Sequence, residues 1–434
     1  MDGQIKTEPA ARANRTQLDQ IGERVNAILA EGEQGVVDAV DCILQTAADL
    51  RASDIHFEPW DEAISLRFRL DGLLHEAARL PKSCQERLMA RIKVLARMAV
   101  YHKHMPQDGR IDPDRSKCGC AFRVAAFPTI YGEKVSLRLL GEQDRPLNLG
   151  ELGLPQTVTD TLRQLVGRAS GVVLLTGPSS SGKTTTIYAL LRALMADRET
   201  PPHVVTIEDP VEYRLGNVAQ TQIGPPTELT FATALRSLLR QDPEVIVVGE
   251  IRDAETAHMA IQAGLTGHLV ISTIHCGTAA GVFTRLLDMG IEPFLVASSL
   301  TGVLAQRLVR RVCEACAEPY QPDSHLLTAL GLSSGDGYRR GRGCPACQGI
   351  GYKGRTALGE LLLVDDALSE AVLAWKRTRV LHGIAMDSGM HPLVRDGLDK
   401  ARAGVTALEE IARVLPPEVK HPKREEAREN GRYE

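Results

Sequence analysis

The sequence predicts an α/β protein in which a parallel sheet with helices on its faces follows a smaller α+β unit. Three observations lead to this prediction. From about residue 156 onward, apolar strands alternate with helical segments, which is the pattern of a parallel sheet. Before that point, residues 52–139 contain strands in which apolar and polar side chains alternate. Near the carboxyl end, two Cys-x-x-Cys pairs have the spacing of a structural metal site.

Composition excludes several classes of protein. The 434 residues are 43% hydrophobic and 24% charged, which is ordinary for a globular chain. The 51 basic and 55 acidic residues nearly balance, and aromatics make up only 4%, so we expect no nucleic-acid partner. No apolar run approaches the roughly eighteen residues of a membrane span, and the polar amino terminus lacks a signal core. We expect a soluble protein of a reducing compartment that reaches a membrane only through partners.

The amino-terminal elements are predicted in order along the chain. Residues 1–35 are polar, and we expect a tail that is helical in part. A small α+β domain is expected over residues 36–141, and Pro146, Gly150, Gly153 and Pro155 indicate a linker over 142–155. Helical spacing covers residues 36–51 and 83–100, and strands are expected at 52–59, 64–70, 73–75, 122–128 and 134–139.

The second domain is expected over residues 156–414. Its alternating strands and helices are predicted at 171–176, 182–197, 203–207, 230–241, 244–248, 254–264 and 268–274. Residues 284–312 are expected to be mostly helical, residues 313–347 to hold the cysteine pairs, and further helices to follow to about residue 414. Residues 415–434 form a charged tail that we expect to fray.

The strongest motif is a phosphate-binding loop. It matches the GxxxxGK[ST] pattern and comprises Gly177, Pro178, Ser179, Ser180, Ser181, Gly182, Lys183 and Thr184. A strand before it and a helix after it favour a nucleotide site over a chance turn, because loop N–H groups and the helix N-terminus then converge on phosphate. Lys183 supplies a point charge for the outer phosphates, and the Thr184 hydroxyl can bind Mg²⁺. We include the adjoining Thr185 in the predicted binding segment.

Acids and histidines follow three of the later strands. Glu208 and Glu250 each close an apolar strand, where open α/β sheets place their ligands, and Glu250 fits a Mg²⁺-water or general-base position. His268 and His275 bracket the next strand and suggest a phosphate sensor. The alternatives are a solvated acidic loop and histidines with a structural role.

The paired cysteines are Cys313, Cys316, Cys344 and Cys347, with 27 residues between the two pairs. Four thiolates form a closed tetrahedral site, so we predict a structural zinc. Free thiols and a redox pair are the alternatives. The remaining cysteines are expected not to be ligands: Cys42, Cys84, Cys118, Cys120 and Cys276.

Several arginines could stabilise transition-state charge, because phosphate-loop ATPases often take an arginine from elsewhere. The alternative is that they line solvated strand faces. The candidates are Arg67, Arg69, Arg110, Arg123, Arg138, Arg285 and Arg355.

From about residue 36 to residue 414, the order of these motifs resembles the ATPases of type II secretion and type IV pilus assembly, the GspE/PilB group of secretion-superfamily ATPases. The segments that carry the resemblance are residues 51–59, 107–110, 123–133, the Walker A loop at 177–184, the Asp box at 207–213, the Walker B segment at 245–253, the His box at 267–275, the four cysteines and residues 351–356. The His box departs from the family by continuing as Cys276-Gly277.

The resemblance implies a RecA-like ATPase domain with a zinc subdomain at 313–347, preceded by a PAS-like small domain. It implies a cytoplasmic homo-hexamer, peripheral at the inner membrane and docked to platform proteins, that uses ATP, Mg²⁺ and Zn²⁺. Glu208 matches the catalytic glutamate and Glu250 the Walker B acid, and either could activate water. His268 and His275 match the His box.

The resemblance also assigns roles to arginines and points to a motor. Arg123 and Arg138 match arginines that reach an adjacent protomer's nucleotide, and Arg285 and Arg355 match other functional arginines. The leading hypothesis is an assembly motor for type II secretion. The alternatives are a pilus-assembly or DNA-uptake motor of the same superfamily, a nucleotide-gated scaffold that does not hydrolyse ATP, and a nucleic-acid translocase.

Overall fold

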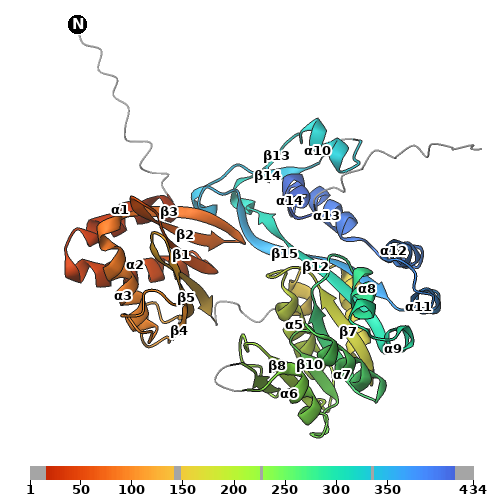
Figure 1. Ribbon diagram of the computed structural model, residues 1–434. Coiled ribbons are helices and arrows are strands. Elements are labelled where there is room, and N and C mark those ends of the chain that lie inside the picture. Colours follow the sequence, from red (N-terminus) through yellow and green to blue (C-terminus); the bar gives the residue numbers. More distant parts are fainter. Residues whose placement is uncertain (1–15, 141–147, 225–227, 334–336, 416–434) are drawn as a thin grey trace, which may run out of the picture.

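The computed structural model describes residues 16–140, 148–224, 228–333 and 337–415 (Figure 1). Two sheets organise these residues. A six-stranded sheet belongs to residues 16–140, which we call the small unit. A seven-stranded sheet belongs to residues 148–415, which we call the large unit. The α/β fold class predicted from the strand and helix pattern is therefore confirmed.

The small unit is an antiparallel sheet with its helices on one face (Figure 1). Alternation produces this arrangement: Ile64, Leu66 and Phe68 are buried under the helices, whereas Arg67 and Arg69 point to the other face. Its elements are α1 (Gln17–Leu29), α2 (Glu33–Asp49), β1 (Asp54–Pro59), β2 (Ala63–Leu70), β3 (Leu73–Pro81), α3 (Gln85–Leu95), β4 (Gln107–Ile111), β5 (Ala121–Thr129) and β6 (Gly132–Leu140), with strand order β3-β2-β1-β6-β5-β4.

The expectation that residues 1–35 are helical in part is confirmed by α1, but the expectation that they form a tail is wrong for this helix. Ile21, Val25 and Leu29 recur every four residues and lie buried in the core of the small unit. Thr16 and Asp19 form a capping box that fixes where the helix begins. Residues 1–15 lie outside the described part of the chain.

The large unit has the predicted parallel sheet, with one antiparallel strand added at its edge. Strands β7, β11, β10, β8 and β9 pair in parallel, and two apolar clusters cover the two faces of the sheet. The strands are β7 (Gly171–Thr176), β8 (Val204–Glu208), β9 (Ala219–Gln222), β10 (Val245–Val248), β11 (Leu269–Ile274), β12 (Leu300–Val312) and β15 (Tyr352–Leu363). The helices against them are α4 (Gln156–Val166), α5 (Lys183–Ala196), α6 (Phe231–Leu238), α7 (Ala254–Leu265), α8 (Gly281–Asp288) and α9 (Pro293–Ser299).

The prediction that residues 284–312 are mostly helical is wrong for their second half. Helix α9 ends at Ser299, and β12 then runs for thirteen residues, of which residues 300–305 pair with β7. The expectation that only helices follow the cysteines is also wrong, because β15 pairs with β12 before α11 (Asp366–Leu373), α12 (Thr378–Asp387), α13 (Leu393–Arg402) and α14 (Leu408–Val414). Both strands are buried over most of their length, so they lack the two-residue alternation that identifies a strand.

The predicted linker contributes its second half to the large unit. Leu149, Leu152 and Leu154 are buried with α4 and α5 in one cluster, while residues 142–147 lie outside the described part. The predicted carboxyl-terminal tail lies outside it as well, from residue 416 onward. Between β12 and β15, the cysteine segment adds a two-stranded sheet of β13 (Ala317–Pro319) and β14 (Arg339–Gly341) and the short helix α10 (Ser324–Ala329).

Candidate nucleotide and metal sites

The phosphate loop connects the carboxyl end of β7 to α5, and two glycines give it its shape. Gly177 has φ +148° and Gly182 has φ +88°. A Cβ atom at Gly177 would lie 2.4 Å from the carbonyl oxygen of Gln306, and one at Gly182 would lie 2.8 Å from the Gln306 side-chain nitrogen. Side chains are therefore excluded at both positions, and backbone N–H groups can face an anion directly.

The loop carries a positively charged lysine and a hydroxyl without a hydrogen-bond partner among the described residues. The Lys183 ammonium donates to the carbonyl oxygens of Gly177 and Pro178, both at 2.9 Å. Burial lowers the pKa of Lys183, with Glu250 opposing and Arg307 adding to the shift. Ser181 Oγ is buried and has no hydrogen-bond partner among the described residues. A phosphate bound here would supply the partner that the Ser181 hydroxyl lacks and would offer Lys183 an anionic acceptor in place of the two carbonyl oxygens.

The threonines after Lys183 divide into an exposed and a buried position. Thr184 is exposed on the first turn of α5, beside the loop, where its hydroxyl is available to a Mg²⁺ ion. Thr185 is half-buried. Thr186 is buried, and its hydroxyl donates to Gln306 Oε1 at 2.8 Å. Gln306 Nε2 in turn donates to the Ser181 carbonyl at 2.9 Å, so one side chain of β12 ties the loop to the helix.

Glu250 and His275 lie on the open side of this loop. Glu250 follows β10, its side chain is 18% exposed, and it pairs with Arg252. His275 Nε2 lies 3.7 Å from Glu250 Oε2, and Nδ1 of the same ring lies 3.2 Å from the Gly177 carbonyl oxygen. The structure therefore brings Lys183, Glu250 and His275 together, as the motifs predict.

Glu208 lies in a buried hydrogen-bond network instead. The residue is 5% exposed. It accepts hydrogen bonds from the Tyr188 hydroxyl, the Thr206 hydroxyl at 2.6 Å and Gln220 Nε2 at 3.1 Å. Burial and the Glu208 carboxylate together raise the pKa of Tyr188, so its phenol remains a proton donor. Tyr188 follows Thr184 by one helical turn, so Glu208 is tied to the helix that carries the loop.

His268 is not brought to the phosphate loop. It precedes β11, whereas His275 follows that strand, and six strand residues separate them by about 20 Å. Its ring contacts the Ala263 carbonyl oxygen of α7 at 3.1 Å. The structure places it at the opposite edge of the sheet from the nucleotide site.

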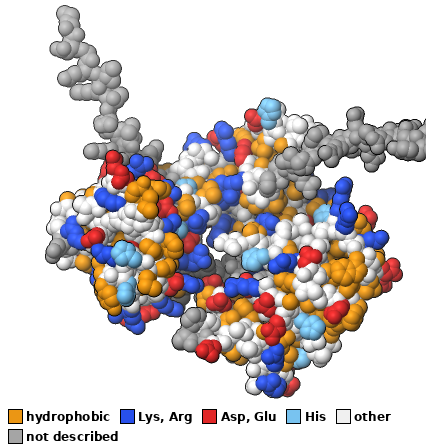
Figure 2. Space-filling view, in the orientation of Figure 1, with side chains coloured by type: hydrophobic (Ala, Val, Ile, Leu, Met, Phe, Trp, Pro, Cys, Tyr) orange, Lys and Arg blue, Asp and Glu red, His pale blue; other side chains and the backbone are white. Residues whose placement is uncertain are grey.

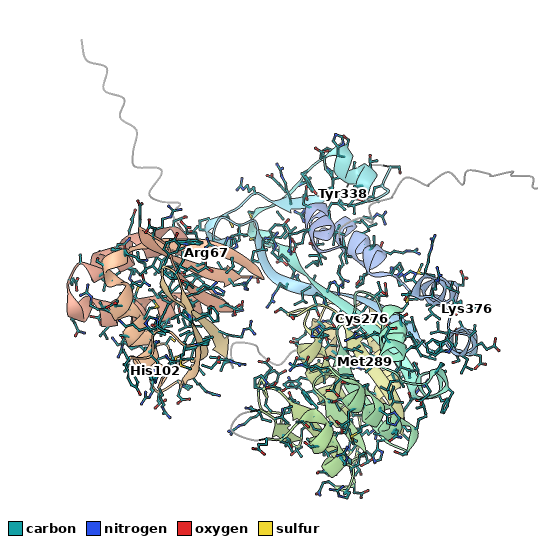
Figure 3. The ribbon with its side chains drawn as sticks, viewed as in Figure 1. Arg67, His102, Cys276, Met289, Tyr338 and Lys376 are labelled. Atoms are coloured by element: carbon teal, nitrogen blue, oxygen red, sulfur yellow. The ribbon has the colours of Figure 1, made fainter. Side chains whose placement is uncertain are left out.

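The arginines of the small unit form a row across five strands. The residues directly opposite one another are Arg110, Arg123, Arg138, Asp54 and Arg69. Asp54 lies within 3.0 Å of Arg138 Nε and 3.1 Å of Arg69 Nε. Burial opposes ionisation of Asp54, but Arg138, Ser53 and Arg69 outweigh it and lower its pKa. Lys and Arg side chains gather where the small unit faces the large unit, and Arg67 lies on that side (Figures 2 and 3).

Two further predicted arginines are exposed in the large unit. Arg285 is on α8. Burial raises the pKa of the Cys276 thiol, and the nearby charge of Arg285 opposes part of that rise. Cys276, which is labelled in Figure 3, directly follows His275 in the sequence. Arg355 is on β15, opposite Arg310. No hydrogen bond or ion pair within the described ranges joins either arginine to the phosphate loop.

The prediction from sequence missed Arg307. This half-buried side chain donates to the carbonyl oxygens of Gln306 at 3.1 Å and Gly277 at 3.0 Å. A Cβ atom at Gly177 would lie 3.2 Å from its Nη1, which places the guanidinium beside the loop. The assignment of residues 284–312 to helix concealed it, because strand pairing with β7 is what brings Gln306 and Arg307 to this edge.

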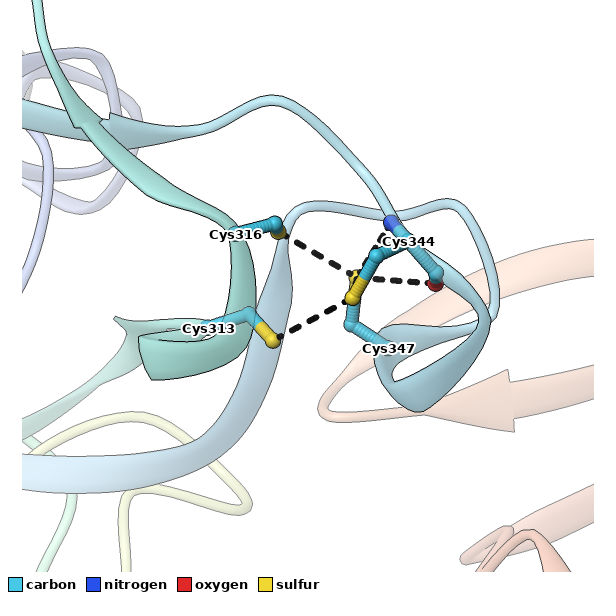
Figure 4. Close-up of side chains that lie close together, drawn as sticks. All are labelled: Cys313, Cys316, Cys344 and Cys347. Carbon is cyan, nitrogen blue, oxygen red and sulfur yellow. Dashed lines mark hydrogen bonds between the residues drawn. The ribbon is translucent and has the colours of Figure 1, made fainter.

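The four predicted cysteine ligands converge (Figure 4). Their Sγ atoms lie within 4.8 Å of one another, with separations of 3.9 Å (Cys313–Cys344), 3.8 Å (Cys316–Cys347) and 3.7 Å (Cys344–Cys347). A tetrahedral zinc with bonds of about 2.3 Å needs sulfurs about 3.8 Å apart. A disulfide would need about 2.05 Å. The geometry therefore fits a closed tetrahedral ion.

Backbone N–H groups support ionised sulfur in this cluster. Cys347 Sγ accepts from the Cys344 and Gly351 amides, each at 3.2 Å. At Cys344, burial opposes ionisation, but hydrogen bonds from the Cys347 backbone and side chain outweigh it and lower the pKa to about 7. At Cys316, burial raises the pKa to about 12, so binding a cation there would have to displace a proton.

Comparison with known proteins places this chain among secretion ATPases. Residues 29–413 match the family described as Type II/IV secretion system protein. The Type II secretion system ATPase E of Vibrio cholerae is 42% identical over 406 residues, which cover 91% of this chain and 78% of that protein. The Type IV pilus assembly ATPase PilB of Thermus thermophilus is 41% identical, over 94% of this chain and 46% of that protein.

Solved structures agree on the fold. The pilus retraction motor PilT with bound ADP is 26% identical with a TM-score of 0.58, covering 86% of this chain and 96% of PilT. The Legionella pneumophila ATPase DotB is 22% identical with a TM-score of 0.63, over 86% of this chain and 93% of DotB. Among the described residues, no helix is both long and apolar enough to span a membrane.

Proposed function

The chain belongs to the Type II/IV secretion system protein family, and on that premise we propose that it is an ATP-hydrolysing motor of type II secretion. The observation that carries this proposal is the convergence of Lys183, Glu250 and His275 on one glycine-shaped loop. Relatives named for type II secretion, 42% identical over most of the chain, support the pathway.

Each loop residue has a separate task in hydrolysis. Backbone amides of residues 177–182 and the Lys183 ammonium bind the phosphates, and the Thr184 hydroxyl would hold Mg²⁺, which neutralises phosphate charge when bound. Lys183 then exchanges the two carbonyl oxygens it now contacts for phosphate oxygens. Gln306 keeps the loop and α5 in register while this exchange occurs.

Glu250 is the carboxylate that accepts the proton of the attacking water. Its side chain reaches solvent and lies beside the loop, with His275 between it and Gly177. Glu208 fits this task less well, because three hydrogen bonds already engage its oxygens inside the protein. We assign Glu208 to positioning α5, the helix that carries Lys183 and Thr184.

The arginine row acts on the nucleotide of a neighbouring copy in a homo-hexamer. Arg69 and Arg138 share Asp54, and Arg110 pairs with Asp112. Arg123, which lies between Arg110 and Arg138 in the row, has no ion pair with a described residue, so its positive charge is available to an anion. An arginine supplied by a neighbour stabilises the charge that develops on phosphate during transfer. Arg285, Arg355 and Arg307 are the candidates from the large unit. We place the assembly at the cytoplasmic face of the inner membrane, held there by platform proteins.

The cysteine cluster would hold one zinc ion with a structural role, since four thiolates leave no open coordination position. Metal analysis of protein purified without added zinc should find about one zinc per chain. A Cys344→Ser protein with unchanged metal content would contradict the assignment.

Turnover by the purified protein tests the proposal. Wild type should release phosphate from ATP only with Mg²⁺, and Lys183→Ala should abolish this release. Lys93→Ala is not a suitable control, because Lys93 is buried in an ion pair with Glu133. Lys376→Ala, on the surface of the large unit (Figure 3), is a suitable control and should keep full turnover. Nucleotide binding without any phosphate release would support a nucleotide-gated scaffold instead.

A pilus-assembly or DNA-uptake motor is the second candidate. The 41% identity to the Thermus PilB over 94% of this chain supports a pilus or DNA-uptake motor almost as strongly as the type II relatives support a secretion motor. Restoring secretion, or restoring pili, in a strain that lacks the chain distinguishes the two.

A further inference from the structure

The segment that leaves the second cysteine pair touches the small unit in three places. Gln348 Oε1 accepts from the Leu18 amide of α1 at 3.3 Å. The Ile350 side chain is partly buried and packs against the apolar core of the small unit. The Gly354 amide donates to Asp71 Oδ2 in the β2–β3 turn at 2.8 Å. Residues 348–354 thus meet α1, the core and the turn of a unit that lies more than two hundred residues earlier in the sequence.

The cysteines fix the shape of this segment. Gly349 and Ile350 donate their amides to the Cys344 and Cys347 carbonyl oxygens at 2.9 Å and 3.0 Å. The Gly351 amide donates to Cys347 Sγ, and its carbonyl accepts from the Cys313 amide at 3.0 Å. Every residue from 349 to 351 is therefore bonded to a member of the cysteine cluster.

Close packing leaves this shape little freedom. A Cβ atom at Gly351 would lie 2.4 Å from the Gly341 carbonyl oxygen, and one at Gly343 would lie 2.5 Å from the Gly349 carbonyl oxygen. Figure 4 shows the strands of the small unit, in pale orange, beside the loop that carries Cys344 and Cys347. Contacts between two units of one chain usually permit relative motion, so a few polar contacts hold an orientation only if the surface that offers them is rigid.

We propose that the tetracysteine loop is the docking surface for the chain's own small unit, and that metal binding by the four thiolates makes this surface rigid. The occupant is α1 with the β2–β3 turn, and the surface is residues 348–354. When the metal is removed, the loop loses its shape, the three contacts are lost together, and the small unit is released from the large unit. The inference does not depend on ATP hydrolysis, but under the proposed function it means that the metal also positions the arginine row.

Hydrogen exchange of the full-length protein tests this proposal, with zinc alone as the ligand and no nucleotide present. Zinc-loaded protein should exchange about ten-fold more slowly than chelated protein in residues 16–29, 70–75 and 348–356, as expected for losing a hydrogen bond to a charged acceptor. Strands β7 and β11 should exchange equally in both states. Equal exchange of residues 16–29 and 70–75 with and without zinc would overturn the proposal, and so would faster exchange of β7 and β11 after chelation.

Two variants break the contacts without touching the cysteines. Asp71 has φ +46° and Gln348 has φ +56°, so glycine preserves the backbone at both positions while removing the side chain. Asp71→Gly with Gln348→Gly should keep about one zinc per chain yet exchange in residues 16–29 and 70–75 as fast as chelated wild type. Asp61→Gly, in the exposed turn at the other end of β2, is the matched control and should behave as wild type.

The results separate this proposal from the proposed function. Zinc-dependent protection that persists in the double variant would refute the docking surface even if the protein hydrolyses ATP. Protection that the double variant loses would support it even if the protein does not.

Discussion

The two glutamates that follow β8 and β10 should respond in opposite ways when each is changed to glutamine. Glu250→Gln removes a solvent-reaching carboxylate whose partners are Arg252 and His275. Ion pairs of this kind contribute at most about 1 kcal/mol, so the unfolding midpoint should hardly move. Loss of a general base reduces turnover by about 10²- to 10⁴-fold, so phosphate release should fall that far while nucleotide binding remains.

Glu208→Gln should have the opposite signature. Three hydrogen bonds to a buried charge become bonds to a neutral amide, and the amide NH₂ meets groups that are themselves donors. We estimate a cost of about 2 kcal/mol, since hydrogen bonds to charged groups contribute roughly 1.5–3 kcal/mol and neutral ones roughly 0.5–1.5 kcal/mol. The unfolding midpoint should drop by a few degrees, and turnover should fall less than in Glu250→Gln.

Thermal unfolding and Mg²⁺-dependent phosphate release, measured on both variants with saturating ATP, show which glutamate acts in hydrolysis and which stabilises the fold. Tyr188→Phe is the matched control, because it removes one of the Glu208 hydrogen bonds and leaves both carboxylates. The reasoning is refuted if Glu208→Gln keeps the wild-type midpoint and loses turnover as completely as Glu250→Gln does.

Three further predictions concern the loop, the arginine row and pH. Gln306→Ala removes the side chain that joins Ser181 to Thr186 and should weaken ATP binding about ten-fold by equilibrium titration, whereas Gln262→Ala, exposed on α7, should not. Arg123→Ala, on the exposed face of β5, should leave the unfolding midpoint unchanged but lower turnover, and mixing it with Lys183→Ala protein should restore part of the turnover if the arginine acts on a neighbour's nucleotide. Burial lowers the pKa of His56 below 6.5, so on acidification the unfolded chain binds a proton at His56 before the folded chain does. The free energy of unfolding, measured by urea titration, should therefore be unaffected by His56 above pH 6.5 and should decrease below pH 6.5. In His56→Asn this decrease should be smaller.

The phosphate loop was predictable because its information is local. The glycine at 177, the glycine at 182 and the lysine after it specify a backbone that only one strand–turn–helix geometry accommodates. The tetracysteine site was predictable for a similar reason, since each Cys-x-x-Cys pair supplies two corners of a tetrahedron from one short turn. Neither inference needed to know which strands are neighbours.

The features that the sequence did not predict depend on which strands are neighbours in the sheet. Strand β12 is buried over most of its length and pairs with β7 on one side and β15 on the other, so its apolar run lacks alternation and was assigned to a helix. Gln306 and Arg307 reach the phosphate loop only through that pairing. The two histidines were grouped for a different reason: they bracket one predicted strand, and the length of that strand already places His268 about 20 Å from His275.

The arginine row and the tetracysteine loop together explain why the small unit needs a fixed position. Like charges on adjacent strands repel one another, and Arg123 lies between Arg110 and Arg138 without an ion pair to a described residue, so its charge is unfavourable until an anion meets it. Under the proposed function the row acts on the phosphate loop of a neighbouring copy, so the direction in which the small unit points from its own large unit decides whether the row can reach that nucleotide. An error of about 1 Å in placing a catalytic group can reduce the rate about 100-fold. If the small unit rotated freely, its arginines would therefore contribute little to the rate of hydrolysis. Residues 348–354 make the contacts to the small unit, and the cysteine cluster bonds their backbone, which is the arrangement that we propose limits such rotation.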